Sequence, residues 1–172
     1  MTVKEYTFSG KLTWGPFESS EKSASYDAKF TWDPNQTTIN SAKIKVAFDW
    51  SGGFFGSTGL LCPGEWAKAF FNGSLVYEKD WYFTCEHAES DEKDVTDLLQ
   101  NGDNYIEVRA FNTAIPGGNS LNYTVTFTID FTGQEPKYTS PTPPFQFPDL
   151  TTIIIVIIIL VILYFVIRRF VK

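Results

Sequence analysis

The residues with the most obvious chemical potential lie in one segment, CEHAESDEKDVTD, which contains His87, the only histidine of the chain. Six carboxylates share the segment: Glu86, Glu89, Asp91, Glu92, Asp94 and Asp97. A catalytic histidine needs a partner held at hydrogen-bond distance, and no motif here supplies one. The carboxylates could surround a calcium ion, but their spacing differs from an EF-hand and lacks its central glycine. We therefore expect a surface histidine in a solvated acidic loop, with no metal.

Other catalytic motifs are absent from the sequence. There is no GxSxG nucleophile motif, no phosphate-binding glycine loop that opens a helix and no zinc-ligand spacing. The glycine-rich stretch SGGFFGSTGLLCPG follows a predicted strand and is interpreted as a flexible loop. We therefore expect a protein that is not an enzyme and that has no catalytic residues, no cofactor and no metal.

The charge and the cysteine content exclude further classes of protein. The 172 residues carry 20 Asp and Glu against 14 Lys and Arg, a net charge of -6, which argues against nucleic-acid binding by the soluble domain. Two cysteines, Cys62 and Cys85, are too few for a disulfide scaffold and form no CxxC pair. We expect one disulfide between them, closing a loop around Asn72-Gly73.

The strongest signal is the apolar segment from Leu150 to Ile167, which has no charged or amide side chain. Its length is at the short end of the roughly 17 to 25 residues that cross a bilayer as a helix. Tyr164 fits the interfacial belt, and Arg168, Arg169 and Lys172 form a cationic flank in the tail 168–172. The sequence predicts a transmembrane helix over 150–167, with a lipid membrane as one partner.

A proline-rich segment precedes this helix. Residues 133–149 contain five prolines: Pro136, Pro141, Pro143, Pro144 and Pro148. Proline removes a backbone donor and favours extended conformation, so the segment is predicted to be a semi-rigid stalk.

Residues 1–132 show the two-residue alternation of β-strands with one buried face. In LNYTVTFTIDFT, apolar side chains alternate with Asn, Thr and Asp, and AKIKVAFDW repeats the pattern with Ile44, Val46, Phe48 and Trp50. Asn72-Gly73 separates two further candidate strands and is typical of a tight hairpin turn. Seven or eight short strands predict an all-β fold, an antiparallel β-sandwich or jelly roll, followed by the C-terminal helix.

Part of this domain resembles the jelly-roll modules of the galactose-binding-like superfamily. The resemblance covers the run from WAKAFFNGS to VRAFN and rests on these positions: Asn72, Gly73, Asp94, Val95, Thr96, Leu98, Leu99, Gly102, Asn104 and Asn112. It implies an antiparallel jelly roll and suggests glycan binding, since family members include sugar-binding modules. The whole architecture also resembles single jelly-roll capsid or surface proteins of archaeal, Sulfolobus-type viruses that carry a hydrophobic tail.

The sequence offers candidate residues for glycan binding and, separately, for N-glycosylation. Trp81 and Tyr82 lie in an irregular segment, so with the loop around Asn112 they are the nearest candidates for stacking against a glycan, although packing in the core is the alternative for Trp81. Asn35, Asn72 and Asn122 begin N-x-Ser/Thr sequons and are candidate glycosylation sites.

Two functions remain. The first is a membrane-anchored structural protein of a virion that assembles with other copies or other structural proteins; the alternative is a cell-surface carbohydrate-binding or adhesion module. The basic flank predicts a cytoplasmic C-terminus, and the first residues contain no secretory signal. A domain that folds in the cytoplasm and coats an internal viral membrane satisfies both expectations, so we place the structural function first.

Overall fold

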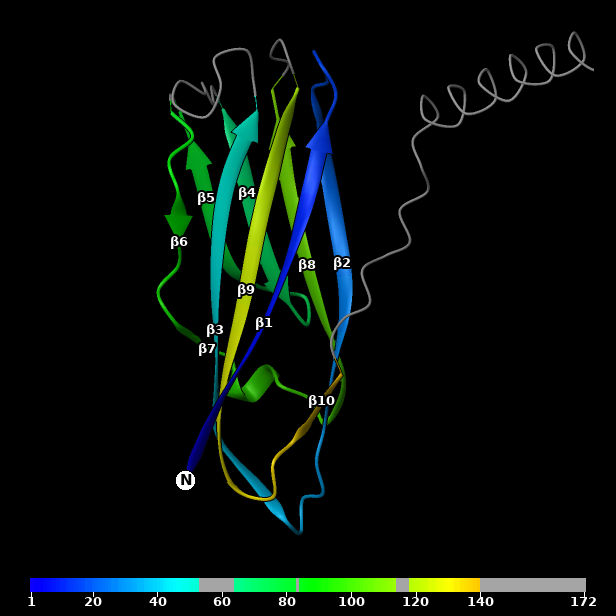
Figure 1. Ribbon diagram of the computed structural model, residues 1–172, viewed down its shortest axis with the longest axis vertical. Helices are drawn as coiled ribbons and strands as arrows, with labels where there is room; N and C mark the ends of the chain where they lie inside the picture. The colour runs from blue at the N-terminus through cyan, green and yellow to red at the C-terminus, as the bar shows by residue number, and fades with distance from the viewer. Residues whose placement is uncertain (53–63, 83, 114–117, 140–172) are drawn as a thin grey trace, which may run out of the picture.

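The computed structural model describes residues 1–52, 64–82, 84–113 and 118–139. In these ranges the chain forms two β-sheets packed face to face (Figure 1). The strands are β1 (Thr2–Trp14), β2 (Ser20–Thr31), β3 (Thr37–Gly52), β4 (Glu65–Phe71), β5 (Ser74–Trp81), β6 (Ala88–Glu89), β7 (Lys93–Asp94), β8 (Gly102–Asn112), β9 (Asn119–Gly133) and β10 (Lys137–Thr139). A short 3-10 helix, η2 (Thr96–Leu98), precedes β8.

Strand order identifies the fold. Sheet A has the order β1-β9-β3-β6, with β7 also paired to β3, and sheet B has the order β10-β2-β8-β4-β5. The pairs are nested: β1 with β9, β2 with β8, β3 with β6 and β7, and β4 with β5, all antiparallel. The chain is thus one long hairpin whose successive strand pairs alternate between the two sheets. This is the jelly-roll arrangement of an antiparallel sandwich, as the sequence predicted.

The predicted buried faces are confirmed. On β3 and β9 the apolar side chains of each alternation face the interior, among them Phe48, Leu121 and Phe127. Their neighbours on the same strands, mostly threonine, lysine and aspartate, face water. Alternation was a sound guide here because a strand places successive side chains on opposite faces.

The hairpin turn predicted at Asn72-Gly73 is also present. It joins β4 to β5, and both residues have positive φ, 48° and 81°. Asparagine and glycine tolerate this left-handed backbone better than other residues, so the local sequence chooses the turn.

The sandwich extends beyond the predicted boundary at residue 132. Strand β9 ends at Gly133, and β10 then pairs with β2, so Lys137–Thr139 belong to the sandwich rather than to the stalk. Tyr138 on β10 packs against Phe30 and Tyr6. Sequence reasoning missed this strand because it is short and follows Pro136.

The remaining C-terminal predictions concern residues outside the described part of the chain. These are the rest of the stalk, the helix at 150–167 and its flank with Tyr164, Arg168, Arg169 and Lys172. Within the described ranges, no helix has the length and apolar character needed to cross a membrane.

The sandwich has an upper and a lower end in the orientation of Figure 1. At the upper end of Figure 1, β1, β3, β5 and β8 finish and β2, β4 and β9 begin. At the lower end, the β2–β3 and β9–β10 connections lie side by side, joined by the hydrogen bond from the Thr37 hydroxyl to the Gln134 carbonyl (2.7 Å).

Candidate functional site

Trp81, a predicted glycan contact, lies in the core at the upper end. Its side chain is only 3 % exposed, and its indole N–H donates to the carbonyl of Glu86 at 2.9 Å. The ring packs edge-on against Trp50, which in turn packs against Trp14, with ring centres 6.0 and 5.3 Å apart. This buried tryptophan cluster stabilises the sandwich and leaves Trp81 with no face for a sugar.

The other two predicted glycan contacts do not share a surface either. Asn112 is fully buried: its amide N–H donates to the carbonyl of Glu18 at 2.8 Å, and its carbonyl accepts from Asn119 at 2.8 Å. Tyr82 is 71 % exposed. Asn112 therefore braces the β1–β2 connection and forms no common surface with Tyr82.

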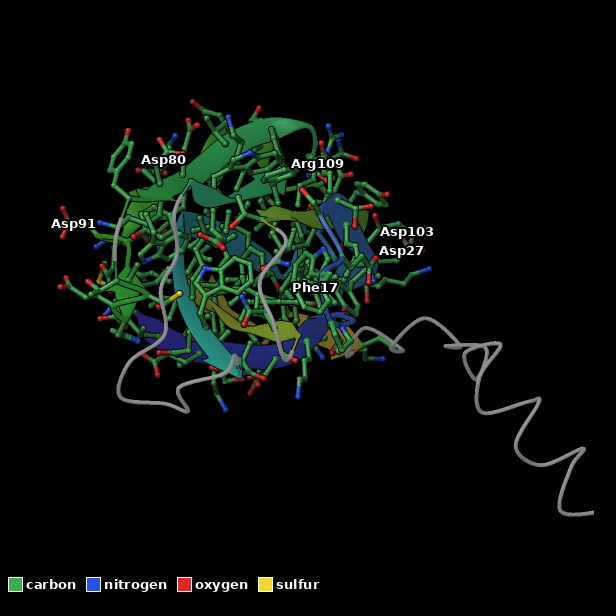
Figure 2. The ribbon with its side chains drawn as sticks, turned by 90° about the horizontal axis from the view of Figure 1, so that it is seen from above. Phe17, Asp27, Asp80, Asp91, Asp103 and Arg109 are labelled. Atoms are coloured by element: carbon green, nitrogen blue, oxygen red, sulfur yellow. The ribbon has the colours of Figure 1, made fainter. Side chains whose placement is uncertain are left out.

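The β1–β2 connection that Asn112 braces presents an aromatic ring to solvent. Phe17 is 67 % exposed and has a φ of 59°, unusual for a bulky side chain (Figure 2). The Glu18 carboxylate accepts the N–H of Gly15 at 2.8 Å and pairs with Lys22 at 2.9 Å. These contacts, led by the Lys22 hydrogen bond, lower the pKa of Glu18 and hold the turn in place.

Sequence reasoning missed a buried carboxyl at the same end. Glu65, the first residue of β4, is fully buried, and one of its oxygens accepts the hydroxyl of Thr113 at 2.6 Å. Its other oxygen, Oε2, has no hydrogen-bond partner in the described part of the chain. Burial raises the pKa of Glu65 above its ordinary value. No sequence signal distinguishes it from the exposed glutamates, because the burial comes from neighbouring strands.

The acidic segment around His87 forms ion pairs with β3. Glu92 contacts Lys43 and Glu89 contacts Lys45, both at 2.9 Å, and His87 contacts Asp49 at 2.5 Å with both side chains more than half exposed. Across the described residues, no group of three or more histidine, cysteine or acidic side chains is arranged to hold a metal ion. Glu89 and Glu92 thus link the β6–β7 edge to β3 within sheet A.

Cys85 is disulfide-bonded, and Cys62, the other cysteine of the sequence, lies outside the described residues. The pairing of Cys62 with Cys85 therefore stays a prediction.

The three sequons differ in accessibility. Asn35 lies exposed in the β2–β3 connection. The Asn72 side chain is engaged at both ends, donating to the carbonyl of Leu98 and accepting the N–H of Tyr105, each at 2.7 Å. Asn122 lies on the outer face of sheet A and donates to the hydroxyl of Ser51 at 3.1 Å. Asn35 is thus the most accessible acceptor of the three, and glycosylation stays a prediction.

The outer face of sheet B carries apolar side chains on a surface where alternation would place polar ones. Trp66 and Phe111 stack with ring centres 6.2 Å apart, and Phe70 opposes Leu75 on the next strand. Arg109 lies over the Phe70 ring and Lys68 over the Trp66 ring, at 5.1 and 5.4 Å (Figure 2 labels Arg109). We call the set Trp66, Phe70, Leu75, Tyr105 and Phe111 the sheet B apolar face.

The outer face of sheet A is different. Thr7 and Thr126, and Ser9 and Thr124, form hydroxyl–hydroxyl hydrogen bonds of 3.1 and 3.0 Å across β1 and β9. Most of the other side chains on this face are charged, hydroxyl or amide groups. A face of this composition is compatible with permanent contact with water.

A cavity of about 280 Å³ opens at the lower end between the β2–β3 and β9–β10 connections. Its lining combines an indole, hydroxyls, an amide and charges of both signs. The residues are Thr31, Trp32, Asp33, Thr37, Gln134, Glu135 and Lys137. Trp32 is only partly buried and contributes the indole of this wall.

Comparisons with known proteins place the chain in no family. No protein-family model and no curated protein matches it. Among solved structures, it is similar to FMN-binding β-glucuronidase from Facaelibacterium prausnitzii L2-6 (17 % identity, TM-score 0.33, 62 % of this chain and 16 % of that chain). It is also similar to dimeric latent PorU from Porphyromonas gingivalis (9 %, 0.36, 73 % and 13 %) and to turnip yellow mosaic virus (10 %, 0.32, 81 % and 84 %).

The chain spans less than a fifth of the first two of these structures. At these TM-scores the likenesses do not establish a shared fold. The jelly-roll assignment rests on the strand order of the chain itself.

Proposed function

We propose that the protein is a non-enzymatic structural subunit, anchored to a membrane by residues 150–167, that assembles with other copies through the sheet B apolar face. The assembly is a virion coat, of the archaeal-virus type that the sequence resembles, or a surface layer. The observation that carries the proposal is the row of aromatic side chains on an outer sheet face.

Apolar side chains on this face favour contact with protein. Tyr105 and Leu75 are exposed, and Trp66, Phe70 and Phe111 are partly exposed. Contiguous apolar surface of this kind marks interaction sites, and aromatic residues with arginine are enriched in interfaces.

Four of the charges on the same face form two ion pairs. Arg109 donates two hydrogen bonds to Glu107, at 2.8 and 2.9 Å, and Lys68 contacts Glu78 at 2.5 Å. Covering the face would therefore leave none of these four charges without a partner, which keeps the desolvation penalty of assembly low.

The anchor supports the same function by raising local concentration. Copies held on one membrane meet at a high effective concentration, so a modest interface is enough for assembly. In the sequence, the hydrophobic segment 150–167 with its cationic flank is the proposed attachment to the membrane. The proline-rich stalk would hold the sandwich away from the bilayer.

Anchoring is tested by flotation with phosphatidylcholine vesicles. The full chain should float with the vesicles, whereas a chain ending at Thr139, which keeps β10, should stay in the dense fraction and remain folded. Equal flotation of both chains, or a shortened chain that is unfolded, would contradict the proposed anchor.

Assembly is tested with the full chain on vesicles by electron microscopy and chemical cross-linking. Phe70→Glu places a charge in the sheet B apolar face and should abolish ordered arrays, while the matched variant Thr126→Glu on the outer face of sheet A should assemble like the wild type. Circular dichroism checks that both variants are folded. Arrays of Phe70→Glu equal to those of the wild type would rule out this face.

A further inference from the structure

We propose that the cavity beside Trp32 binds a neutral glycan. The inference does not rest on the structural function above, and it places a carbohydrate site at the opposite end of the sandwich from Trp81 and Asn112. It follows from the chemistry of the lining, the charge balance and the rigidity of the walls.

The lining has the composition that sugar recognition needs. An indole gives an apolar surface against which the C–H face of a sugar ring can pack. Asp33 and Glu135 supply hydrogen-bond acceptors, Lys137 supplies donors and the Gln134 amide supplies both. A few polar groups beside an aromatic wall are typical of a small-molecule site, and here they include both donors and acceptors, which hydroxyl groups require.

Charge balance distinguishes a sugar from an ionic ligand. The two carboxylates of the lining, Asp33 and Glu135, are matched by the Lys137 ammonium and by Lys4, which contacts Glu135 at 3.2 Å. A strongly anionic ligand would meet two carboxylates, and a cationic ligand would meet the Lys137 ammonium, while Lys4 outside the lining already pairs with Glu135. A neutral polyhydroxyl ligand meets neither obstacle.

Hydrogen bonds fix the position of Trp32. Its backbone N–H donates to the side-chain carbonyl of Asn101 at 3.1 Å, and its carbonyl accepts the Asn101 amide at 2.8 Å. These bonds tie the end of β2 to the start of β8. The backbone that carries the tryptophan is therefore positioned before any ligand arrives, which reduces the entropy lost on binding.

The two connections that form the cavity are also tied to each other. The Gln134 N–H donates to the carbonyl of Gln36 at 2.9 Å, and the Thr37 hydroxyl donates to the carbonyl of Gln134 at 2.7 Å. Gly133 permits this approach: its φ is +100°, and a Cβ there would lie 1.9 Å from the Gln36 carbonyl oxygen. Rigid walls of this kind hold polar groups in place for a ligand.

A second cavity, of about 570 Å³, adjoins the first and shares Glu135 and Lys137 with it. Tyr6 lines this second cavity, and within the described residues its buried hydroxyl has no hydrogen-bond partner. The hydroxyl is covered by protein, so it is the continuity of the two cavities, and not Tyr6, that sets the length of the ligand. The ligand is therefore inferred to be an oligosaccharide whose terminal residue lies beside Trp32.

The test is a glycan array probed with the full chain in detergent, carrying neutral glucose-, galactose- and mannose-terminated oligosaccharides with sialylated and sulfated ones. Two variants test the cavity: Trp32→Ala removes the aromatic wall, and Gln134→Ala removes an exposed amide whose backbone contacts do not depend on it. We expect each variant to reduce binding of neutral glycans at least tenfold.

Two matched variants serve as controls. Gln36→Ala changes an exposed glutamine of the facing connection that does not line the cavity, and Tyr82→Ala removes the exposed aromatic at the upper end. Both should bind like the wild type. Absence of neutral-glycan binding by the wild type, a preference for charged glycans, or binding that Gln134→Ala leaves intact and Tyr82→Ala removes would each overturn the inference. A melting curve for Trp32→Ala separates loss of the site from loss of the fold.

Discussion

The two ends of the sandwich use the same kinds of residue in opposite ways. At the upper end, tryptophans and polar side chains face inward: Trp81 lies in the core, and Asn112 and Asn119 hydrogen-bond to each other. At the lower end, Trp32 and the polar side chains around it line an open cavity. A tryptophan beside amides and carboxylates therefore indicates a binding site only where the fold leaves space in front of the ring, as it does at Trp32 and not at Trp81.

The tryptophan substitutions should show the largest contrast between the ends. Trp81→Ala removes a fully packed ring and should lower the free energy of unfolding by about 4 kcal/mol. Trp32→Ala removes a partly exposed ring and should lower it by about 1 to 2 kcal/mol, because less apolar surface returns to water. Urea unfolding followed by tryptophan fluorescence measures both. Equal losses would show that Trp32 is a core residue and that the two ends do not differ in this way.

Two glycines give a matched comparison of backbone packing. Gly133→Ala at the lower end would force a Cβ into the Gln36 carbonyl and should lower the free energy of unfolding by about 3 kcal/mol. Gly64→Ala at the upper end has a similar φ of +88°, but among the described residues its new Cβ would meet only the Thr113 methyl at 4.0 Å, so about 1 kcal/mol is expected. Thermal unfolding by calorimetry compares them. A Gly64→Ala variant less stable than Gly133→Ala would contradict the close approach of the two lower connections.

The smallest expected effect concerns Glu65 at the upper end. Burial raises its pKa, so the folded state holds the proton more tightly than the unfolded chain. The stability that this carboxyl contributes is therefore present at low pH and falls as pH rises from the ordinary value near 4.5 through the raised folded pKa. Glu65→Gln should remove this loss, leaving the variant about 1 kcal/mol more stable than the wild type at pH 8 and equal to it at pH 4.

Thr113→Val provides the opposing change for the Glu65 experiment. The Thr113 hydroxyl favours the ionised carboxylate, so its removal should raise the pKa of Glu65 further and steepen the loss of stability with pH. Unfolding curves at several pH values measure the slope for each variant. A Glu65→Gln protein that is less stable than the wild type at pH 8 would show that the folded site prefers the charged form.

The sequence by itself determined the local features of the fold. Alternation over β3 and β9 predicted which side chains are buried, from Ile44 to Phe131, because the two faces of a strand are set by position along it. The Asn72-Gly73 turn was predictable because the preference for positive φ belongs to those two residues.

Only the tertiary structure decided the nested order of the strands and everything that depends on it. The burial of Trp81 and Glu65, the exposed aromatic rings of sheet B and the pairing of β10 with β2 all arise from neighbours distant in sequence. The cavity beside Trp32 brings together residues 31–37 and 134–137, which become neighbours only when the long hairpin folds into two layers. Local preference acts over a few residues, whereas a site between connections is made by packing, so the sequence supplied the Trp32 side chain and the fold supplied the space in front of it.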